Sequence, residues 1–224
     1  MKFDLTVLVA TCDKYNFLWN PFTELFNLYW DKNVEVKKIF VGETIKENIS
    51  DFTFLTPGKF PNNAWTNRIR YALDQIETKY VLLLLDDYFI VKTIPMENFE
   101  TYFYLLEHYQ ADKLSIHYPH AALKLTPLIK EFDIYQMNQD SPYTTTTQSS
   151  IWNVEFFKSC LEDNQSIWEF EIEGSEKLNN RGHKILLHQT IDRWYLESMT
   201  KGKFNPEYYH ILNQHNLSNL IHTT

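Results

Sequence analysis

The 224-residue chain has little glycine and little cysteine, and each shortage excludes a class of protein. None of the five glycines lies in a loop ending in Gly-Lys-Ser/Thr, which excludes a P-loop ATPase. Two cysteines are too few for the disulfide framework of a small secreted domain. The sequence contains neither a signal-peptide pattern nor an apolar run long enough to span a bilayer. We therefore expect a cytoplasmic protein without a transmembrane segment.

Clustered positive charge is also missing from the sequence. The net charge is −8 and no run of lysines and arginines occurs, which argues against nucleic acid as the main partner. The same charge argues against broad adhesion to an anionic membrane, although peripheral contact with a membrane stays open. Aromatic residues, in contrast, make up 16% of the chain. Because aromatic faces stack on sugar rings and on nucleobases, we expect some of them to line a surface groove.

The first half of the chain predicts an α/β sheet. Apolar strand patterns alternate there with helical patterns, which is typical of parallel strands joined by helices. The carboxyl ends of such strands lie along one edge of the sheet. The second half is less regular, and no linker separates it from the first. We expect strands at 5–10, 34–41, 52–55, 81–85, 113–117 and 184–188, and helices at 18–29, 62–76, 99–109, 152–161 and 177–182.

Two adjacent carboxylates, Asp86 and Asp87, directly follow the apolar run 81–85. Carboxylates at the end of a buried strand are costly unless a cation meets them. In open α/β sheets, ligands bind outside the carboxyl ends of the strands. Magnesium and manganese are typically held by one or two carboxylates together with phosphate oxygens. The pair is therefore a candidate metal site, and a solvated Asp-Asp turn is the alternative.

His188 also follows an apolar run, at 184–187, and is a candidate third metal ligand. The alternative is a histidine with a purely structural role. In the segment 168–173, three glutamates alternate with bulky apolar residues. On an extended segment these carboxylates share one side. They form either the solvated face of an edge strand or the surroundings of a general base whose proton affinity is raised by desolvation.

Four segments, taken in order, resemble the GT-A fold glycosyltransferases, particularly the inverting group that builds bacterial polysaccharides. They are an opening strand and turn at 6–15, a segment before a helix at 62–69, the strand ending in Asp86 and Asp87, and an acidic segment followed by a helix at 168–185. The resemblance implies a GT-A type α/β fold: a Rossmann-like mixed sheet flanked by helices in a single domain. Residues 1–95 would then form the half that binds the nucleotide sugar, and residues 96–224 the half that binds the acceptor.

The resemblance also implies an activity, which is metal-dependent transfer of a sugar from a nucleotide-sugar donor to a hydroxyl of a glycan or lipid-linked glycan. It implies Mn²⁺ or Mg²⁺ as cofactor and inversion at the anomeric carbon. Glu171 is the implied catalytic base, with Glu169 the other candidate. The implied metal ligands are Asp86, Asp87 and His188. The implied donor-binding residues are Thr11, Asp13, Tyr15, Glu43, Asn67, Arg68, Asp86 and Lys203, and the acceptor-side residues are Gln148, Trp152 and Trp168.

Two functions from other classes stay open beside the transferase. A sugar nucleotidyltransferase shares the α/β layout and the use of metal, but normally has a glycine-rich loop after the first strand, and residues 11–15 contain no glycine. A non-catalytic module that binds sugars or nucleotides can use the same fold, because fold alone does not fix function.

Overall fold

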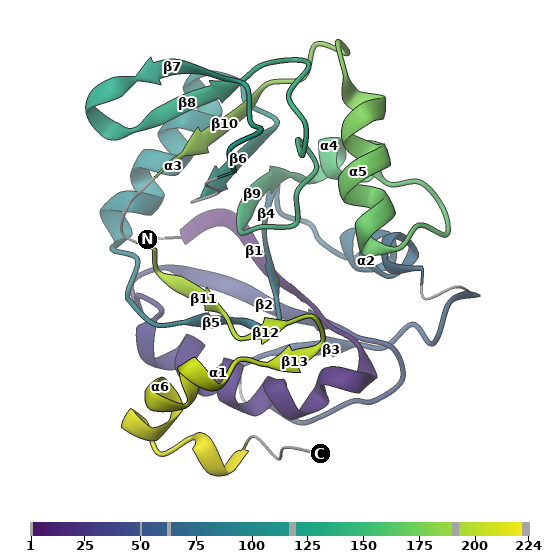
Figure 1. Cartoon of the computed structure of the whole chain (residues 1–224), viewed down its shortest axis with the longest axis vertical. Helices are drawn as coiled ribbons and strands as arrows, with labels where there is room; N and C mark the ends of the chain where they lie inside the picture. The colour runs from purple at the N-terminus through teal and green to yellow at the C-terminus, as the bar shows by residue number, and fades with distance from the viewer. Residues whose placement is uncertain (1, 50, 62–63, 117–119, 190–192, 221–224) are drawn as a thin grey trace.

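The computed structural model describes residues 2–49, 51–61, 64–116, 120–189 and 193–220. Within these residues, nine strands form one mixed sheet in the order β3-β2-β1-β4-β9-β6-β10-β8-β7 (Figure 1). The strands are β1 (Lys2–Ala10), β2 (Glu35–Val41), β3 (Thr53–Leu55), β4 (Tyr80–Leu85), β6 (Lys113–Ile116), β7 (Leu125–Ile129), β8 (Ile134–Met137), β9 (Ser150–Asn153) and β10 (Ile185–His188).

Six α-helices accompany the sheet in the described ranges: α1 (Trp19–Tyr29), α2 (Trp65–Leu73), α3 (Met96–His108), α4 (Val154–Cys160), α5 (Ile167–Leu178) and α6 (Tyr209–Gln214). Two small antiparallel pairs complete the fold. One joins β5 (Tyr88–Ile90) to β11 (Tyr195–Glu197), and the other joins β12 (Met199–Thr200) to β13 (Lys203–Phe204). None of the described helices is both long and apolar enough to cross a membrane.

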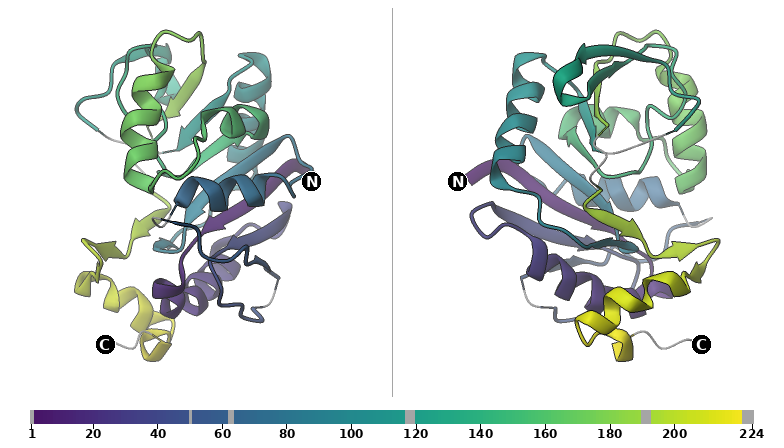
Figure 2. Two further views of the ribbon diagram at one scale, coloured as in Figure 1. Left: turned by 90° about the vertical axis from the view of Figure 1, so that its right-hand side faces the viewer. Right: turned by 60° about the vertical axis from the view of Figure 1, so that its left-hand side comes forward.

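Helices cover both faces of the sheet because successive strand residues point to opposite sides. On β1, Leu5, Val7 and Val9 pack into a core with α1, α3 and α6. Leu8 and Ala10 pack into a second core with α2, α4 and α5. Figure 2 shows α5 and α2 on one side of the sheet and α3 on the other. The predicted mixed α/β sheet flanked by helices is thereby confirmed.

The parallel strands β2, β1 and β4 end at one edge of the sheet. In the register of these strands, Ala10 lies opposite Val41 on one side and Leu85 on the other. The next residues therefore leave the sheet together. The amide of Asp86 donates to the carbonyl of Ala10 at 3.3 Å, and the amide of Thr11 donates to the carbonyl of Val41 at 3.0 Å. This pairing brings Thr11 and Asp86 side by side, although they are far apart in the sequence.

The predicted extended segment at 168–173 is wrong, because these residues belong to helix α5. The helix begins with a capping box: the Ser166 hydroxyl accepts from the Glu169 amide at 3.3 Å, and the Glu169 carboxylate accepts from the Ser166 amide at 2.7 Å. The residues buried on its inner side are Phe170, Gly174, Ser175 and Leu178, which recur at the spacing of one helix face. The glutamates between them therefore point in different directions rather than to one side.

Other boundaries also differ from those predicted. Trp152 lies in β9, and the helix expected from it begins at Val154. The helix expected at 177–182 is the end of α5 followed by a turn, in which Gly182 has a φ of 80°. The end of the predicted strand 113–117 and the start of the predicted helix 62–76 lie outside the described residues. The returns of the chain at β7–β8 and at β11–β13 were not predicted.

Candidate functional site

A cavity of about 510 Å³ opens at the sheet edge where β1 and β4 end. One wall consists of the segments that follow these strands, 10–12 and 85–88, together with the start of α2. The opposite wall consists of residues 147–148 and the first half of α5. Residues 197–202, from the chain that returns after β11, close a third side. Figure 1 shows α5 above the ends of β1 and β4, and the β12–β13 hairpin below them.

Asp86 lies at the bottom of this cavity with only 4% of its surface exposed. The Thr11 hydroxyl donates to its carboxylate, and the Trp19 indole donates to the Thr11 hydroxyl at 2.6 Å. Burial, and secondly the charge of Asp87, raise the pKa of Asp86 well above its ordinary value. Cys12 lines the same wall, and burial raises the pKa of its thiol to about 11, so it remains protonated and is a poor nucleophile.

Asp87 lines the cavity beside Asp86 and begins the turn into β5. The Ser198 amide donates to its backbone carbonyl at 2.7 Å, which fixes the turn against the returning chain. Burial, and secondly the charge of Glu197, raise the pKa of the Asp87 carboxyl to about 7. Arg68, which lines the cavity, does not relieve this charge, because it pairs with Glu43 at 2.8 Å; Arg193 pairs with Glu197 at 2.6 Å.

Two adjacent carboxylates whose ionisation the protein resists fit a divalent cation. Oxygen ligands suit Mg²⁺ and Mn²⁺, which need only one or two carboxylates when phosphate oxygens and water complete the shell. In the ranges that the structure describes, no group of three or more histidine, cysteine or acidic side chains is arranged to hold a metal. A cation here therefore needs oxygens from a bound ligand, which matches the cavity beside the pair.

His188 does not join this pair, so the predicted third ligand is wrong. It ends β10, and two strands, β9 and β6, lie between β10 and β4. The ends of β4 and β10 are therefore three strand spacings apart, which is roughly 14 Å. The Nδ1 atom of His188 instead lies 3.0 Å from the hydroxyl of Tyr102 on α3. The sequence placed His188 correctly at the end of a strand, but it does not reveal which strands lie between.

Glu171 faces the cavity from α5, opposite the aspartates. Its Oε1 atom accepts three hydrogen bonds: from the Thr147 amide at 2.6 Å, the Thr147 hydroxyl at 2.8 Å and the Thr146 hydroxyl at 3.2 Å. Its Oε2 atom accepts none from the described residues. One oxygen is therefore fixed by the protein, while the other is available to a ligand. This arrangement suits a carboxylate that takes a proton from a bound hydroxyl.

Lys113 supports the loop that holds Glu171. The side chain is fully buried, and its Nζ donates to the carbonyls of Thr144 at 3.0 Å and Thr146 at 2.9 Å. It lies 4.0 Å from the centre of the Trp152 ring. Burial lowers the pKa of the Lys113 amine to about 7. The sequence does not reveal this role, because nothing marks the first residue of a short strand as buried.

Four of the predicted donor-binding residues line the cavity: Thr11, Tyr15, Arg68 and Asp86. Glu43 lies just behind them, where its Oε1 accepts from Arg68 and its Oε2 accepts from the Asp13 amide at 3.2 Å. The role of these residues toward a donor stays a prediction. The Glu43–Arg68 pair does explain the position of Arg68, since a buried guanidinium needs a carboxylate partner.

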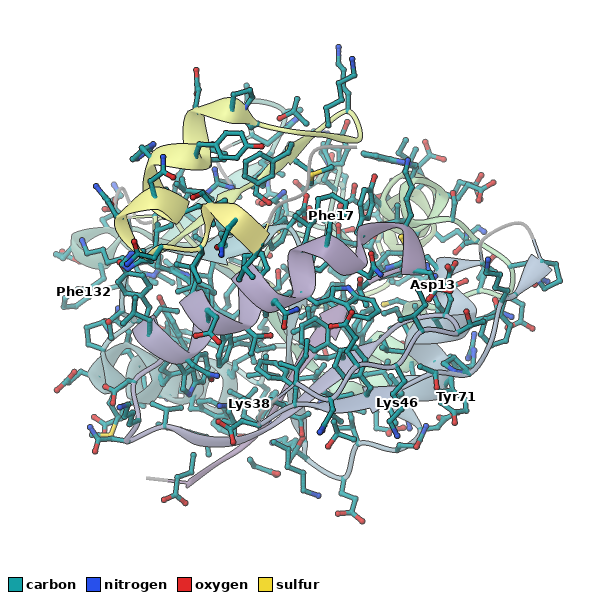
Figure 3. The ribbon with its side chains drawn as sticks, turned by 90° about the horizontal axis from the view of Figure 1, so that it is seen from below. Asp13, Phe17, Lys38, Lys46, Tyr71 and Phe132 are labelled. Carbon is teal, nitrogen blue, oxygen red and sulfur yellow. The ribbon has the colours of Figure 1, made fainter. Side chains whose placement is uncertain are left out.

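Two other predicted donor residues serve the scaffold instead of the cavity. The Asp13 carboxylate accepts from the amides of Thr44 and Ile45, both at 3.0 Å, and so holds the turn after β2. Figure 3 shows Asp13 at the start of the helical segment that precedes α1. Asn67 accepts from the Asn164 amide at 2.6 Å, which ties α2 to the loop before α5. Neither side chain lines the cavity.

The basic residue that reaches the cavity in this part of the chain is Lys201, not the predicted Lys203. Lys203 is exposed on β13 and does not line the cavity, whereas Lys201 and Gly202 do. Lys201 and Gly202 form the two-residue turn between β12 and β13. Their φ angles are both positive, 50° and 76°, as the tight turn of a β-hairpin requires. Among the described contacts Lys201 has no ion-pair partner, so its charge is available to a ligand.

Of the three residues predicted to bind the acceptor, Gln148 and Trp168 line the cavity, and their role toward an acceptor stays a prediction. Gln148 accepts a hydrogen bond from the Tyr195 hydroxyl at 2.6 Å. Trp152 does not reach the cavity, because it is fully buried and its ring stacks on Phe157 with centroids 4.3 Å apart. Glu169, the second candidate base, is exposed and caps α5 rather than facing the cavity.

No family model matches the chain, and no curated protein matches its sequence. Solved structures do match. The structure of S. aureus TarS 1-349 aligns with a TM-score of 0.58 at 15% identity, over 87% of this chain and 59% of that one. The TarS 1-349 complexes with UDP and with UDP-GlcNAc each align with a TM-score of 0.57, at 14% and 16% identity. The chain has the GT-A type fold of TarS. The predicted fold is thereby confirmed, and the chain spans 59–60% of the length of these TarS structures.

The raised pKa of Asp87 predicts a pH-dependent effect of Asp87→Asn on the metal-free protein. Between pH 3.8 and about 7 the folded protein keeps a proton that the unfolded chain releases, so this group's contribution to stability falls as pH rises. Asparagine removes the effect. Urea unfolding with a chelator present gives the free energy of unfolding at each pH. The difference between the variant and the native protein should shift in favour of the variant by on the order of 2–4 kcal/mol from pH 4 to pH 8.

Asp4→Asn is the matched control for this experiment, because Asp4 is exposed. Its stability relative to the native protein should stay nearly constant over the same pH range. If Asp87→Asn behaved like the control, the pKa of Asp87 would not be raised in the folded protein.

Proposed function

We propose that this protein transfers a sugar from a nucleotide-sugar donor to a hydroxyl group of an acceptor. The observation that carries the proposal is the convergence on one cavity of two different acidic groups. Asp86 and Asp87 lie on one wall, and Glu171 lies on the other. Their surroundings differ: burial raises the pKa of both aspartates, whereas hydrogen bonds from Thr146 and Thr147 hold the Glu171 carboxylate in place.

The aspartates are the proposed diphosphate side. Asp86 and Asp87 would hold Mn²⁺ or Mg²⁺ together with oxygens of the donor diphosphate, and the ion would neutralise charge on the leaving group. Lys201 would contact the same phosphates from the β12–β13 turn. Thr11, Tyr15 and Arg68 would line the nucleoside side. Because TarS, which has the same fold, is solved with UDP and UDP-GlcNAc, we propose a UDP-sugar as the first donor to test.

Glu171 is the proposed general base. Its Oε2 atom would take the proton of the acceptor hydroxyl while the acceptor oxygen bonds to the anomeric carbon of the donor. The bond from that carbon to the diphosphate breaks in the same step, and its electron pair leaves with the diphosphate. A single displacement of this kind inverts the configuration of the anomeric carbon. A cytoplasmic enzyme that extends a glycan or lipid-linked glycan fits this chemistry.

Glu171→Gln should keep the fold and donor binding while losing turnover. An amide oxygen can accept the three hydrogen bonds that Oε1 accepts now, but the amide nitrogen cannot take a proton. We expect the turnover number to fall by about 10²–10⁴-fold, the usual contribution of a general base. Product formation from UDP-sugars with mixed glycan acceptors measures the effect.

Glu169→Gln is the matched control, because it changes a glutamate two positions away that caps the helix. Glutamine also serves in a capping box, so stability and turnover should stay close to those of the native protein. Loss of turnover in Glu169→Gln with normal turnover in Glu171→Gln would show that Glu171 is not the base.

Nucleotide binding should depend on the metal. A ligand that binds only the folded state raises the melting temperature, by an amount that corresponds to about 2.7 kcal/mol at one hundred times its dissociation constant. We expect UDP or a UDP-sugar to raise the melting temperature with Mn²⁺ present and to have little effect with a chelator. If no nucleotide of a UDP, GDP and dTDP series stabilised the protein under either condition, a non-catalytic module would be the better account.

A further inference from the structure

Trp168 differs from every other tryptophan of the chain. It is 71% exposed, whereas the other five are at most 7% exposed: Trp19, Trp30, Trp65, Trp152 and Trp194. Isolated exposed apolar residues are common on protein surfaces. Trp168, however, borders the cavity. Ile172, one helical turn further along α5, is also 52% exposed. Together they form an apolar strip that leads along the helix from the cavity, and the described residues leave it uncovered.

This strip lies next to the proposed base. Trp168 and Glu171 are three positions apart on α5, so their side chains project from neighbouring positions on the helix surface. Both line the same cavity, with Gln148 and Thr147 beside them. A flat ring packed on the indole would therefore place the groups on its edge near the free Oε2 atom of Glu171. The Gln148 amide and the Thr147 hydroxyl offer further polar contacts to that edge.

The charge around the strip restricts what such a ring can be. Helix α5 carries four glutamates and one lysine, and Glu197 adds a further acidic group at the cavity. An anionic acceptor, such as a polyol phosphate, would meet like charge on this side. A neutral sugar ring would not, and its C–H face packs on an aromatic face while its hydroxyls project from the edge. An indole beside a carboxylate is thus suited to a neutral saccharide.

We propose that the acceptor is a neutral saccharide whose terminal pyranose ring stacks on Trp168 and presents its hydroxyl to Glu171. This inference rests on the proposed function and adds the chemical class of the acceptor. In the reaction, the acceptor oxygen forms the new bond to the anomeric carbon and its proton passes to Glu171, while the bond from that carbon to the diphosphate breaks and its electron pair leaves with the diphosphate. Ile172 extends the contact to a second sugar unit, so longer saccharides bind more tightly than monosaccharides.

Quenching of tryptophan fluorescence by acrylamide tests this inference without any need for turnover. Because the other five tryptophans are buried, accessible quenching reports Trp168. We would titrate the native protein with a panel of neutral oligosaccharides that includes chitotriose, cellotriose and maltotriose, and separately with UDP and Mn²⁺. At least one neutral saccharide should protect Trp168 from acrylamide, with a smaller effect of the corresponding monosaccharide, while UDP with Mn²⁺ should leave the quenching unchanged.

Variants separate this site from the rest of the molecule. Trp168→Ala should weaken binding of the protecting saccharide at least tenfold and leave binding of UDP with Mn²⁺ unchanged. Phe132→Ala is the control, because Phe132 is 67% exposed and lies on the opposite side of the molecule from Asp13 (Figure 3). This control should change neither affinity.

Three results would overturn the inference: no saccharide of the panel protects Trp168, an anionic polyol phosphate protects it better than any neutral saccharide, or UDP with Mn²⁺ alone protects it. The last result would assign Trp168 to the donor. Protection by a saccharide in a protein that binds no nucleotide would keep the saccharide site and instead contradict the proposed transferase.

Discussion

The cavity depends on two adjacent acidic side chains, Asp86 and Asp87, that have no ion-pair partner among the described residues. Asp86 and Asp87 are placed by the parallel pairing of β1 with β4, which the hydrophobic cores on both faces enforce. Burial raises the pKa of both carboxyls, and Arg68, which lines the cavity, is already paired with Glu43. Such an arrangement costs stability in the free protein. A bound cation would relieve the cost and could then hold a diphosphate, which links the fold directly to the proposed ligand.

The opposite wall is built by close packing rather than by charge. Gly174 allows the threonine-rich loop to lie directly on α5, since a Cβ atom at this position would lie 3.1 Å from the Thr145 hydroxyl. That hydroxyl donates to the carbonyl of Phe170 at 2.8 Å, and Lys113 holds the loop from below. These contacts direct the Thr147 amide at Glu171. The candidate base is therefore positioned by a loop, a helix and a buried lysine that are distant in sequence.

Patterns of local origin were predictable from the sequence, and long-range contacts were not. The strand that ends in Asp86 was evident, because five consecutive apolar residues precede two carboxylates. Glu171 was selected through a resemblance, although the helix that carries it was mistaken for an extended segment. Ser166 and Glu169, spaced as in a capping box, were the signal that could have corrected this error.

The failures at His188, Trp152 and Lys203 share one physical cause. Each has the expected residue type at a plausible sequence position, but strand order and packing decide where a side chain lies. His188 is separated from Asp86 by two intervening strands, and Trp152 is turned into the core. Glu197 was missed for the converse reason, since the return of the chain onto β5 has no local sequence signal.

The central claim is that Asp86 and Asp87 bind a divalent cation jointly with a nucleotide diphosphate. The most direct measurement is the electron paramagnetic resonance signal of aqueous Mn²⁺, which is lost when the ion is bound. With the native protein, we expect a small loss of signal alone and a much larger loss when UDP is added. The Asp86→Asn, Asp87→Asn double variant should show only the loss that UDP causes without protein. An equal loss in the native protein and the double variant would contradict the account.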